Sequence, residues 1–256
     1  MKDSNLNNLY PSLTLVGVGP GDPSLLTLAA VEAIKSADVI AYPVSTKGGI
    51  SIAATIADGF ISLEQKHLPL LFPMVNDIDI CKSAWKEAGN KLSENIADGN
   101  QVAFLCQGDV SLYASSAYVL FDIRANHPEC SVKLIPGVTA FAAAAAAGQW
   151  PLVLQQQQLL VMPAPDELEH LEDVINEVNS LGRVLILLKL GRRWGWIKPY
   201  LEQKGLLEYT LFCQRVGFFD EQIKLAKDVP ADDKPYFSLL IIRKDYPELI
   251  STYTSL

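Results

Sequence analysis

The chain has 256 residues, 49% hydrophobic and 20% charged, so it can bury a sizeable core and is not expected to be disordered. Its formal net charge of −8 argues against a nucleic-acid-binding protein, which would normally carry a basic face. A local cluster of Lys and Arg could still bind an anionic ligand. The first residues are polar and no apolar run approaches ~18 residues, so we expect no signal peptide, no membrane span and a cytoplasmic location.

The first motif is a glycine-rich turn that follows a predicted strand. Residues 13–16 form an apolar run typical of a buried strand, and residues 17–21 read Gly-Val-Gly-Pro-Gly. A helix follows, with Asp22 or Thr27 as its cap and with Leu28, Val31 and Ile34 on the face expected to pack on the sheet. The turn therefore lies at the carboxyl end of a sheet, where open α/β folds bind ligands.

A dinucleotide-binding fold is the first alternative for this turn. The glycine spacing is Gly-x-Gly-x-Gly and not Gly-x-Gly-x-x-Gly, and Pro20 lies inside the turn. The next strand ends in Ala41-Tyr42-Pro43, without an acidic residue that could hold a ribose. Both features weigh against an NAD-dependent oxidoreductase.

The other elements follow from hydrophobic periodicity and turn residues. In chain order we predict a strand at 37–42, a helix near 52–57, an irregular stretch at 63–71, a helix at 78–98, a strand at 102–106, a helix at 114–124, a strand at 132–135, a helix at 140–147, a strand at 159–162, a helix at 166–180, a strand at 184–188, a helix at 197–204, and strands at 209–213 and 237–242. The fold is α/β with two domains, of which the N-terminal one has a mainly parallel sheet and the C-terminal one a mixed sheet. The boundary is placed near Pro136-Gly137.

Two further loops follow predicted strands. One spans residues 107–113 and contains Gly108 and Asp109, although Asp109 could simply cap the next helix; the other spans residues 136–139, with Thr139 as a candidate cap. Neither loop contains a catalytic-looking His or a P-loop Lys. The three loops suit binding of a polar, nucleoside-sized ligand through backbone groups.

The one concentrated basic site follows the strand at 184–188. It comprises Lys189, Arg192 and Arg193, which could meet acid groups of a ligand or could be solvated surface charges. The four cysteines are far apart and form no C-x-x-C pair, which predicts small buried thiols in a reducing compartment. We expect no metal site.

The motifs together resemble the tetrapyrrole (corrin and porphyrin) methylases, the class III S-adenosylmethionine-dependent methyltransferases. The matching segments are Val16 to Pro23 with Leu25 to Leu28, Gly108-Asp109 with Tyr113, and Ile135 to Ala140. Within the family the chain is most similar to the group that methylates C20 of precorrin-2 or cobalt-factor II. That similarity rests on Ala41-Tyr42-Pro43, Phe72-Pro73-Met74 with Asp77, Phe141 to Ala147, and Pro235 to Leu239.

The resemblance implies the fold, the cofactor and the site. Residues 1–136 would form the N-terminal domain, with the first cofactor loops and the tetrapyrrole side, and residues 137–256 would complete the cofactor cleft. The cofactor is S-adenosylmethionine, the substrate is a polycarboxylate tetrapyrrole, and the protein is a homodimer. The residues implied to contact the cofactor are Gly19, Pro20, Gln107, Gly108, Asp109, Leu112, Thr139, Ala140 and Leu190. Val110 stands where the family commonly has Pro, which puts the rigidity of that loop in doubt.

The implied reaction needs few protein groups. Methyl transfer from a sulfonium is an in-line displacement, so the protein mainly binds, aligns and desolvates the reactants. Lys189, Arg192 and Arg193 are the candidates for the substrate carboxylates. The base that removes the C20 proton is unassigned, with Asp77 and Tyr113 as guesses. The alternatives are methylation at C17, C11 or on uroporphyrinogen, an NAD-dependent oxidoreductase, and a non-catalytic ligand-binding protein that has kept the fold.

Overall fold

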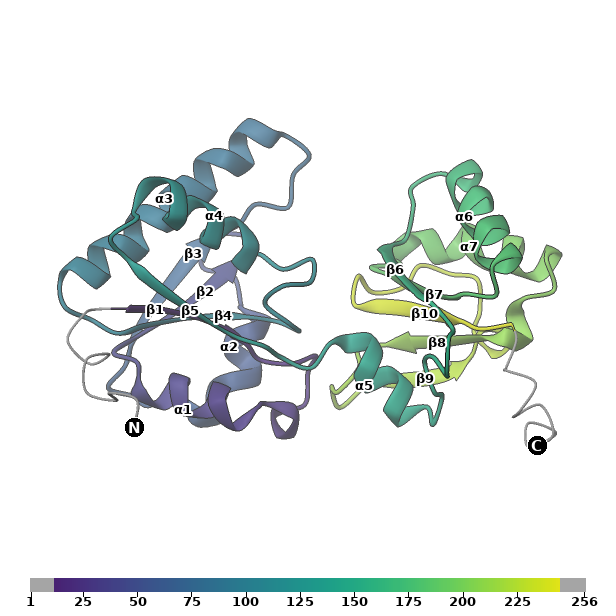
Figure 1. Ribbon diagram of the computed structural model, residues 1–256, viewed down its shortest axis with the longest axis horizontal. Helices are drawn as coiled ribbons and strands as arrows, with labels where there is room; N and C mark the ends of the chain where they lie inside the picture. The colour runs from purple at the N-terminus through teal and green to yellow at the C-terminus, as the bar shows by residue number, and fades with distance from the viewer. Residues whose placement is uncertain (1–11, 245–256) are drawn as a thin grey trace. The chain divides into compact units, whose positions relative to one another are not determined.

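The computed structural model describes residues 12–244. The chain forms two compact units that divide between Thr139 and Ala140, whereas the sequence placed the boundary between residues 136 and 137. Each unit is built on one five-stranded sheet covered by helices (Figure 1). The first sheet is all parallel and the second is mixed, which confirms the predicted fold class.

The strands and helices are short and alternate along most of the chain. The strands are β1 (Ser12–Gly17), β2 (Val39–Val44), β3 (Lys66–Leu71), β4 (Val102–Cys106), β5 (Ser131–Ile135), β6 (Leu159–Pro163), β7 (Val184–Leu188), β8 (Thr210–Gln214), β9 (Gln222–Leu225) and β10 (Ser238–Ile242). The helices are α1 (Leu28–Ser36), α2 (Ile52–Ala57), α3 (Ile78–Ala97), α4 (Ser116–Asn126), α5 (Ala140–Ala147), α6 (Leu168–Ser180) and α7 (Trp194–Gln203).

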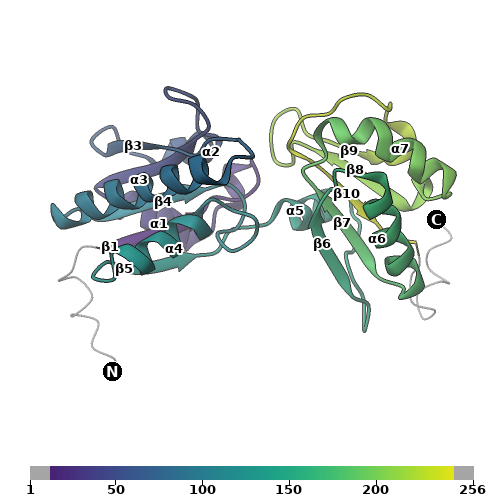
Figure 2. The same cartoon turned by 90° about the horizontal axis from the view of Figure 1, so that it is seen from above.

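The sheet of the first unit has the strand order β3-β2-β4-β1-β5. Helices α3 and α4 run side by side over one face, and α1 and α2 cover the other (Figures 1 and 2). Every residue of the central strand β4 is buried, as expected for a parallel strand covered on both faces. All carboxyl ends of this sheet therefore lie along one edge, where loops can gather.

The helix after the glycine turn differs in detail from the prediction. Thr27 Oγ1 accepts a hydrogen bond from Ala30 N and caps α1, while Asp22 caps a short 3₁₀ turn before it. The buried residues of α1 are Ala30 and Ile34, and Leu28 is 90% exposed. The expected inward position of Leu28 is therefore wrong, because Leu28 is the first residue of the helix and faces solvent.

The stretch at 63–71 is not irregular throughout, because residues 66–71 form β3, the edge strand beside β2. Its outer residues are polar or partly exposed, and Pro69 lies within it, which is tolerated on an edge strand. In α3, Ala88, Leu92 and Ile96 are buried along one face of the helix, whereas Ile80 is half exposed.

The sheet of the second unit has the order β6-β7-β10-β8-β9. Strand β10 runs antiparallel to both β7 and β8, so the ends of β7 and β8 and the start of β10 share one edge. The sequence did not predict β9, a four-residue edge strand with an alternating exposed pattern. Trp194, Ile197 and Leu201 of α7 pack with α6 on one face, and Gly148 at the end of α5 lies against Leu211 on the other.

The four cysteines are all free. Cys106 and Cys213 are buried, as the sequence predicts, whereas Cys81 and Cys130 are only half-buried. In residues 12–244, none of the helices has the length and apolar character needed to cross a membrane.

Candidate functional site

Three loops meet at the carboxyl edge of the first sheet. Loop 1 (residues 18–27) follows β1, loop 2 (residues 107–115) follows β4, and loop 3 (residues 136–139) follows β5. Strand β1 pairs with β4 on one side and with β5 on the other. The strand order therefore makes loop 1 a neighbour of loops 2 and 3, although 79 residues separate loop 1 from loop 2 along the chain.

The loops approach so closely that only glycine fits where they touch. A Cβ on Gly17 would lie 2.6 Å from Gly137 N and 2.7 Å from Gly108 O. A Cβ on Gly137 would lie 2.2 Å from Gly108 O. Because these neighbours are backbone atoms, a side chain at either position would push the loops apart.

Loops 1 and 2 are joined by backbone hydrogen bonds. Gly19 N donates to Gly108 O at 3.2 Å, and Gly108 N donates to Gly19 O at 2.7 Å. Both glycines have positive φ, 78° and 73°. The side chain of Gln107 adds a third link, from Nε2 to Pro20 O at 2.9 Å. Gly19 and Pro20 are consequently buried beneath loop 2.

Asp109 joins loop 2 to loop 3. Its Oδ2 accepts a hydrogen bond from Gly137 N at 2.9 Å, and its Oδ1 accepts from the N–H and the hydroxyl of Ser111. Burial would raise the pKa of Asp109, but the hydrogen bonds from Ser111, Gly137 and Val110 outweigh it and lower the pKa. Asp109 is therefore an ionised clamp and not the cap of α4.

Loop 2 is anchored at the position where the family pattern has Pro. The side chain of Val110 is buried, and its carbonyl accepts a hydrogen bond from the fully buried Ser116 Oγ at 2.7 Å. Beyond it, Leu112 is half-buried, and Tyr113 is 49% exposed with φ 51°. A non-glycine residue in this conformation is uncommon and is often found at functional sites.

No strong nucleophile lies at the base of loop 2. Burial raises the pKa of the Cys106 thiol to about 12, and the charge of Asp109 adds to the increase. The thiol is therefore protonated and inert at neutral pH. Asp77 is no better placed as a base, because its Oδ1 accepts from Asp79 N and Ile80 N and caps α3. The general base stays unassigned.

Loop 3 leads directly into α5. Thr139 is its last residue and Ala140 is the first residue of the helix, and both are half-buried. Gly108, by contrast, faces open space, since a Cβ there would meet no atom within 4 Å. The backbone of loop 2 is thus open to a ligand at this residue.

The second unit carries the basic loop (residues 189–193) after β7. Lys189 and Gly191 have positive φ, 60° and 54°. Leu190 is fully buried in the core of the second unit, its N–H bound to Ser238 O. The Lys189 ammonium lies 5.7 Å from the centroid of the half-exposed Tyr236 ring. The side chain of Leu190 therefore anchors the loop that presents Lys189.

Arg193 and Arg192 differ in their partners. Arg193 donates from Nε and Nη2 to Asp166 Oδ1 at 2.8 and 2.5 Å, and from Nη1 to Lys189 O at 3.1 Å. The side chain of Arg192 is exposed and makes no hydrogen bond or ion pair with any residue in the described part of the chain. Of the two arginines, only Arg192 has its whole guanidinium open to a ligand.

The sequence reasoning missed Arg215. This residue directly follows β8 and has φ 49°, so the ends of β7 and β8 both carry a cationic residue in the left-handed region. Nothing in the Gln214-Arg215-Val216 segment signals this conformation, because left-handed positions usually carry Gly or Asn. Only the strand order places Arg215 beside the start of β10.

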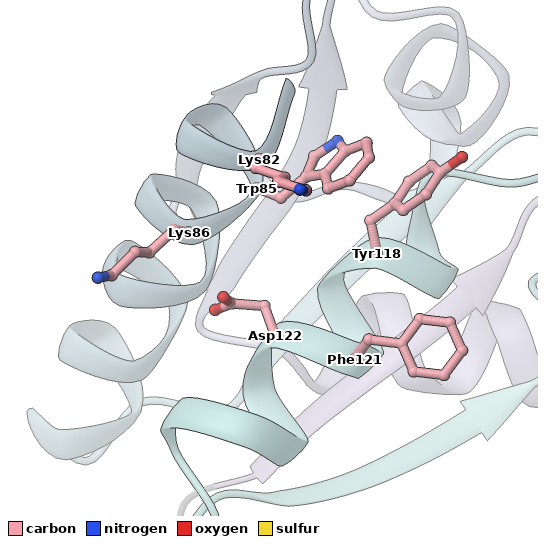
Figure 3. A pocket seen from close by; sticks show the side chains of 6 residues that line it. All are labelled: Lys82, Trp85, Lys86, Tyr118, Phe121 and Asp122. Atoms are coloured by element: carbon pink, nitrogen blue, oxygen red, sulfur yellow. The ribbon is translucent and has the colours of Figure 1, made fainter. Parts of the chain in front are cut away.

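Two hollows lie away from these loops. The first, of about 310 Å³, is on the outer side of α3 and α4 and is lined by Lys82, Trp85, Lys86, Tyr118, Phe121 and Asp122 (Figure 3). In it the rings of Trp85 and Tyr118 stack at 3.9 Å. The second, of about 490 Å³, is beside α5 and is lined by residues from Ala142 to Val153.

In residues 12–244, no three His, Cys, Asp or Glu side chains are grouped so that they could hold a metal ion. The described loops instead provide backbone groups, a few apolar side chains and a clamp carboxylate. This set of groups suits a polar organic ligand.

Comparison with known proteins places the chain in a family. Residues 12–227 match the family of Tetrapyrrole (Corrin/Porphyrin) Methylases. The chain is 30% identical to the cobalt-precorrin-2 C(20)-methyltransferase of Salmonella typhimurium, over 91% of this chain and 97% of that protein. It is 32% identical to the probable cobalt-precorrin-2 C(20)-methyltransferase of Methanocaldococcus jannaschii, over 93% and 99%.

A solved structure extends the similarity to the fold. The uroporphyrin-III C-methyl transferase of Thermus thermophilus, complexed with S-adenyl homocysteine, superposes with a TM-score of 0.59 at 19% identity, covering 96% of each chain. The family match spans most of the sequence, and both relatives align over nearly their whole length. The chain belongs to the tetrapyrrole (corrin/porphyrin) methylase family.

Proposed function

We propose that this protein transfers a methyl group from S-adenosylmethionine to C20 of precorrin-2 or of its cobalt-containing counterpart, in cobalamin biosynthesis. The observation that carries the proposal is the full-length similarity to two proteins named for this reaction in distant organisms. Methylation at another tetrapyrrole carbon, C17, C11 or a carbon of uroporphyrinogen, is the alternative within the family. An NAD-dependent oxidoreductase has no support from the glycine spacing or from the family.

The proposed cofactor contacts are those that the sequence pattern implies. They are Gly19, Pro20, Gln107, Gly108, Asp109, Leu112, Thr139, Ala140 and Leu190. When bound, S-adenosylmethionine supplies an electrophilic methyl group and its own leaving group. The open backbone at Gly108 and the half-buried Leu112 support a ligand at loop 2. Asp109 would act by holding loops 2 and 3 in place, and Leu190 by anchoring the basic loop.

This chain's part in the reaction is alignment and exclusion of water. The displacement is in line, so fixing the two reactants at van der Waals separation supplies much of the rate. The mutual bonds of Gly19 and Gly108 and the Asp109 clamp make the loops rigid before a ligand arrives. Lys189, Arg192 and Arg193 are the proposed contacts for the acid side chains of the substrate, with Arg193 already paired to Asp166.

The protein is further proposed to act as a homodimer in the cytoplasm. The resemblance to the family supports the dimer, and the four free thiols suit a reducing compartment. Light scattering on the purified chain, across a dilution series, gives the oligomeric state directly.

The test of function is anaerobic incubation with methyl-labelled S-adenosylmethionine and precorrin-2, with and without cobalt in the ring. One labelled methyl at C20 is the expected product, and the preferred form identifies the natural substrate. A methyl at another carbon would reassign the enzyme within its family. If neither form is methylated while S-adenosylhomocysteine binds, the cofactor assignment stands and the substrate assignment falls.

The cofactor residues are tested separately by calorimetry with S-adenosylhomocysteine. Leu112→Ala is expected to weaken binding by about tenfold, the usual effect of removing a buried Leu side chain. Leu63→Ala is the matched control, because Leu63 is fully exposed in the same unit. Equal affinity for the two variants would remove Leu112 from the site.

A further inference from the structure

Two cationic residues flank the first residues of β10. Lys189 directly follows β7 and Arg215 directly follows β8, and these strands pair with β10 on its two sides. Leu190 N donates to Ser238 O at 3.1 Å, and Arg215 N donates to Phe237 O at 2.8 Å. Two strand spacings therefore separate the backbones of Lys189 and Arg215, a distance of roughly 10 Å.

Both residues adopt a backbone conformation that normally favours glycine. Their φ angles are 60° and 49°. Four glycines of the second unit, Gly182, Gly191, Gly205 and Gly217, also have positive φ, as do Gln149 and Gln155. Among the residues of this unit that the structure describes, Lys189 and Arg215 are the charged ones in this conformation. Strained backbone that persists at a charged residue commonly marks a functional site.

Each cation is also held in place by its neighbours. Arg193 donates to the carbonyl of Lys189 and is itself fixed by Asp166. Arg215 Nε donates to Asp220 Oδ1 at 2.6 Å, and its guanidinium lies 4.5 Å from the centroid of the Phe218 ring. These contacts leave Nη1 and Nη2 of Arg215 without an acceptor among residues 12–244.

We propose that Lys189 and Arg215 form a two-point binding site for two carboxylates of one ligand. A guanidinium fixed through Nε presents its two Nη groups as a fork, which matches a carboxylate. A second cation, on a backbone position roughly 10 Å away, favours a ligand whose acid groups are spread over a wide framework. The proposal rests on the proposed function, in which the ligand is a tetrapyrrole polycarboxylate, and it adds Arg215 to the substrate contacts.

The probe is uroporphyrin, a stable and fluorescent tetrapyrrole with eight carboxylates, and its octamethyl ester is the uncharged comparison. Equilibrium titration of the wild-type chain should show binding of the acid and much weaker binding of the ester. Lys189→Ala and Arg215→Ala should each raise the Kd of the acid by about tenfold or more, as expected for loss of a charge-assisted hydrogen bond. Arg215→Lys should bind the acid with a Kd between those of the wild type and Arg215→Ala, because lysine keeps the positive charge but lacks the two Nη groups.

Two further variants separate binding from folding. Lys189→Gly and Arg215→Gly remove the cation and relieve the backbone, so the Tm should be unchanged or higher while affinity falls as in the Ala variants. Arg183→Ala is the matched control. Its side chain is 25% exposed and ion-paired, against 27% for Arg215, but it precedes β7 and so lies at the other edge of the sheet.

The outcomes are distinct for the site and for the function. The site proposal fails if wild type does not bind uroporphyrin, if acid and ester bind equally, or if the Arg215 variants bind like Arg183→Ala. It also fails if the variants weaken S-adenosylhomocysteine by the same factor, because the cations would then hold the carboxylate of the cofactor. If the variants lose uroporphyrin affinity but wild type methylates no precorrin-2, the site stands and the proposed function falls.

Discussion

Asp109 Oδ2 and Gly137 N are 2.9 Å apart and form a side-chain hydrogen bond between loop 2 and loop 3. The two residues are 28 positions apart in sequence. The bond holds loop 3 where a Cβ on Gly137 could not fit, against the backbone of Gly17 and Gly108. The Asp109 carboxylate thus helps to hold loop 3 against loops 1 and 2.

Replacing that carboxylate should loosen the loops. Asp109→Asn removes the charge and leaves at least one of the N–H and O–H donors around it without an acceptor, at a cost of about 1–2 kcal/mol in the free energy of unfolding. S-adenosylhomocysteine should bind at least several-fold more weakly. Calorimetry and urea unfolding measure the two effects.

Asp38→Asn is the control for Asp109→Asn. Asp38 Oδ2 also accepts a backbone hydrogen bond, from Gln101 N at 2.8 Å, but at the amino end of the same sheet. Asp38→Asn should lower the free energy of unfolding by a similar amount and leave the affinity for S-adenosylhomocysteine unchanged. Equal loss of affinity in both variants would show that the effect of Asp109 is general destabilisation.

The clamp should also depend on pH. Because the pKa of Asp109 is lowered in the folded chain, its stabilisation is present above the ordinary Asp pKa of about 3.9 and is lost as pH falls through the folded value. The Tm difference between wild type and Asp109→Asn should therefore be constant from pH 7 to 5 and shrink below about pH 4. A difference that stayed constant down to the pH of acid unfolding would contradict the clamp.

The close contacts of Gly137 predict that adding one methyl group there lowers both stability and cofactor binding. Gly137→Ala places Cβ 2.2 Å from Gly108 O, so the loops must separate, and we expect a loss of about 2 kcal/mol or more together with loss of cofactor binding. Gly59→Ala is the control, since a Cβ there meets nothing within 4 Å. It should change stability by less than about 0.5 kcal/mol. Thermal melting and calorimetry distinguish the two variants.

The four cysteines should be alkylated by iodoacetamide in a fixed order. Burial raises the pKa of Cys106 to about 12, and burial also raises the pKa of Cys213 well above its ordinary value. Both should resist iodoacetamide at pH 8 in the native protein, while the half-buried Cys81 and Cys130 react first. Peptide mass spectrometry after timed labelling reads the order, and early alkylation of Cys106 would show that the core beneath loop 2 opens.

Sequence patterns located β1 and β4, which carry loops 1 and 2, and β7, which carries the basic loop, because these three strands are apolar runs. They failed for β3 and β9, two edge strands whose partly exposed residues lack such a run. Edge strands are fixed by pairing with a neighbour, which periodicity in one segment does not report.

The same limit applies to the site. The loop positions could be predicted from local motifs, but the roles of single side chains depend on partners far along the chain. Arg193 is bound to Asp166, 27 residues away, and Gln107 to Pro20, 87 residues away. Arg215 gave no signal at all, since its significance comes from strand order.

The pairing of Gly19 with Gly108 has a consequence for ligand selectivity. Val18 N donates to Cys106 O, Gly19 N donates to Gly108 O, and Pro20 has no N–H, so three successive positions of the turn have no amide left for an anion. Phosphate-binding turns depend on such amides pointing at the ligand. A glycine-rich turn closed in this way offers no amide at these three positions to the phosphates of a nucleotide such as ATP or NAD. The S-adenosylmethionine of the proposed function carries no phosphate and needs none of these amides.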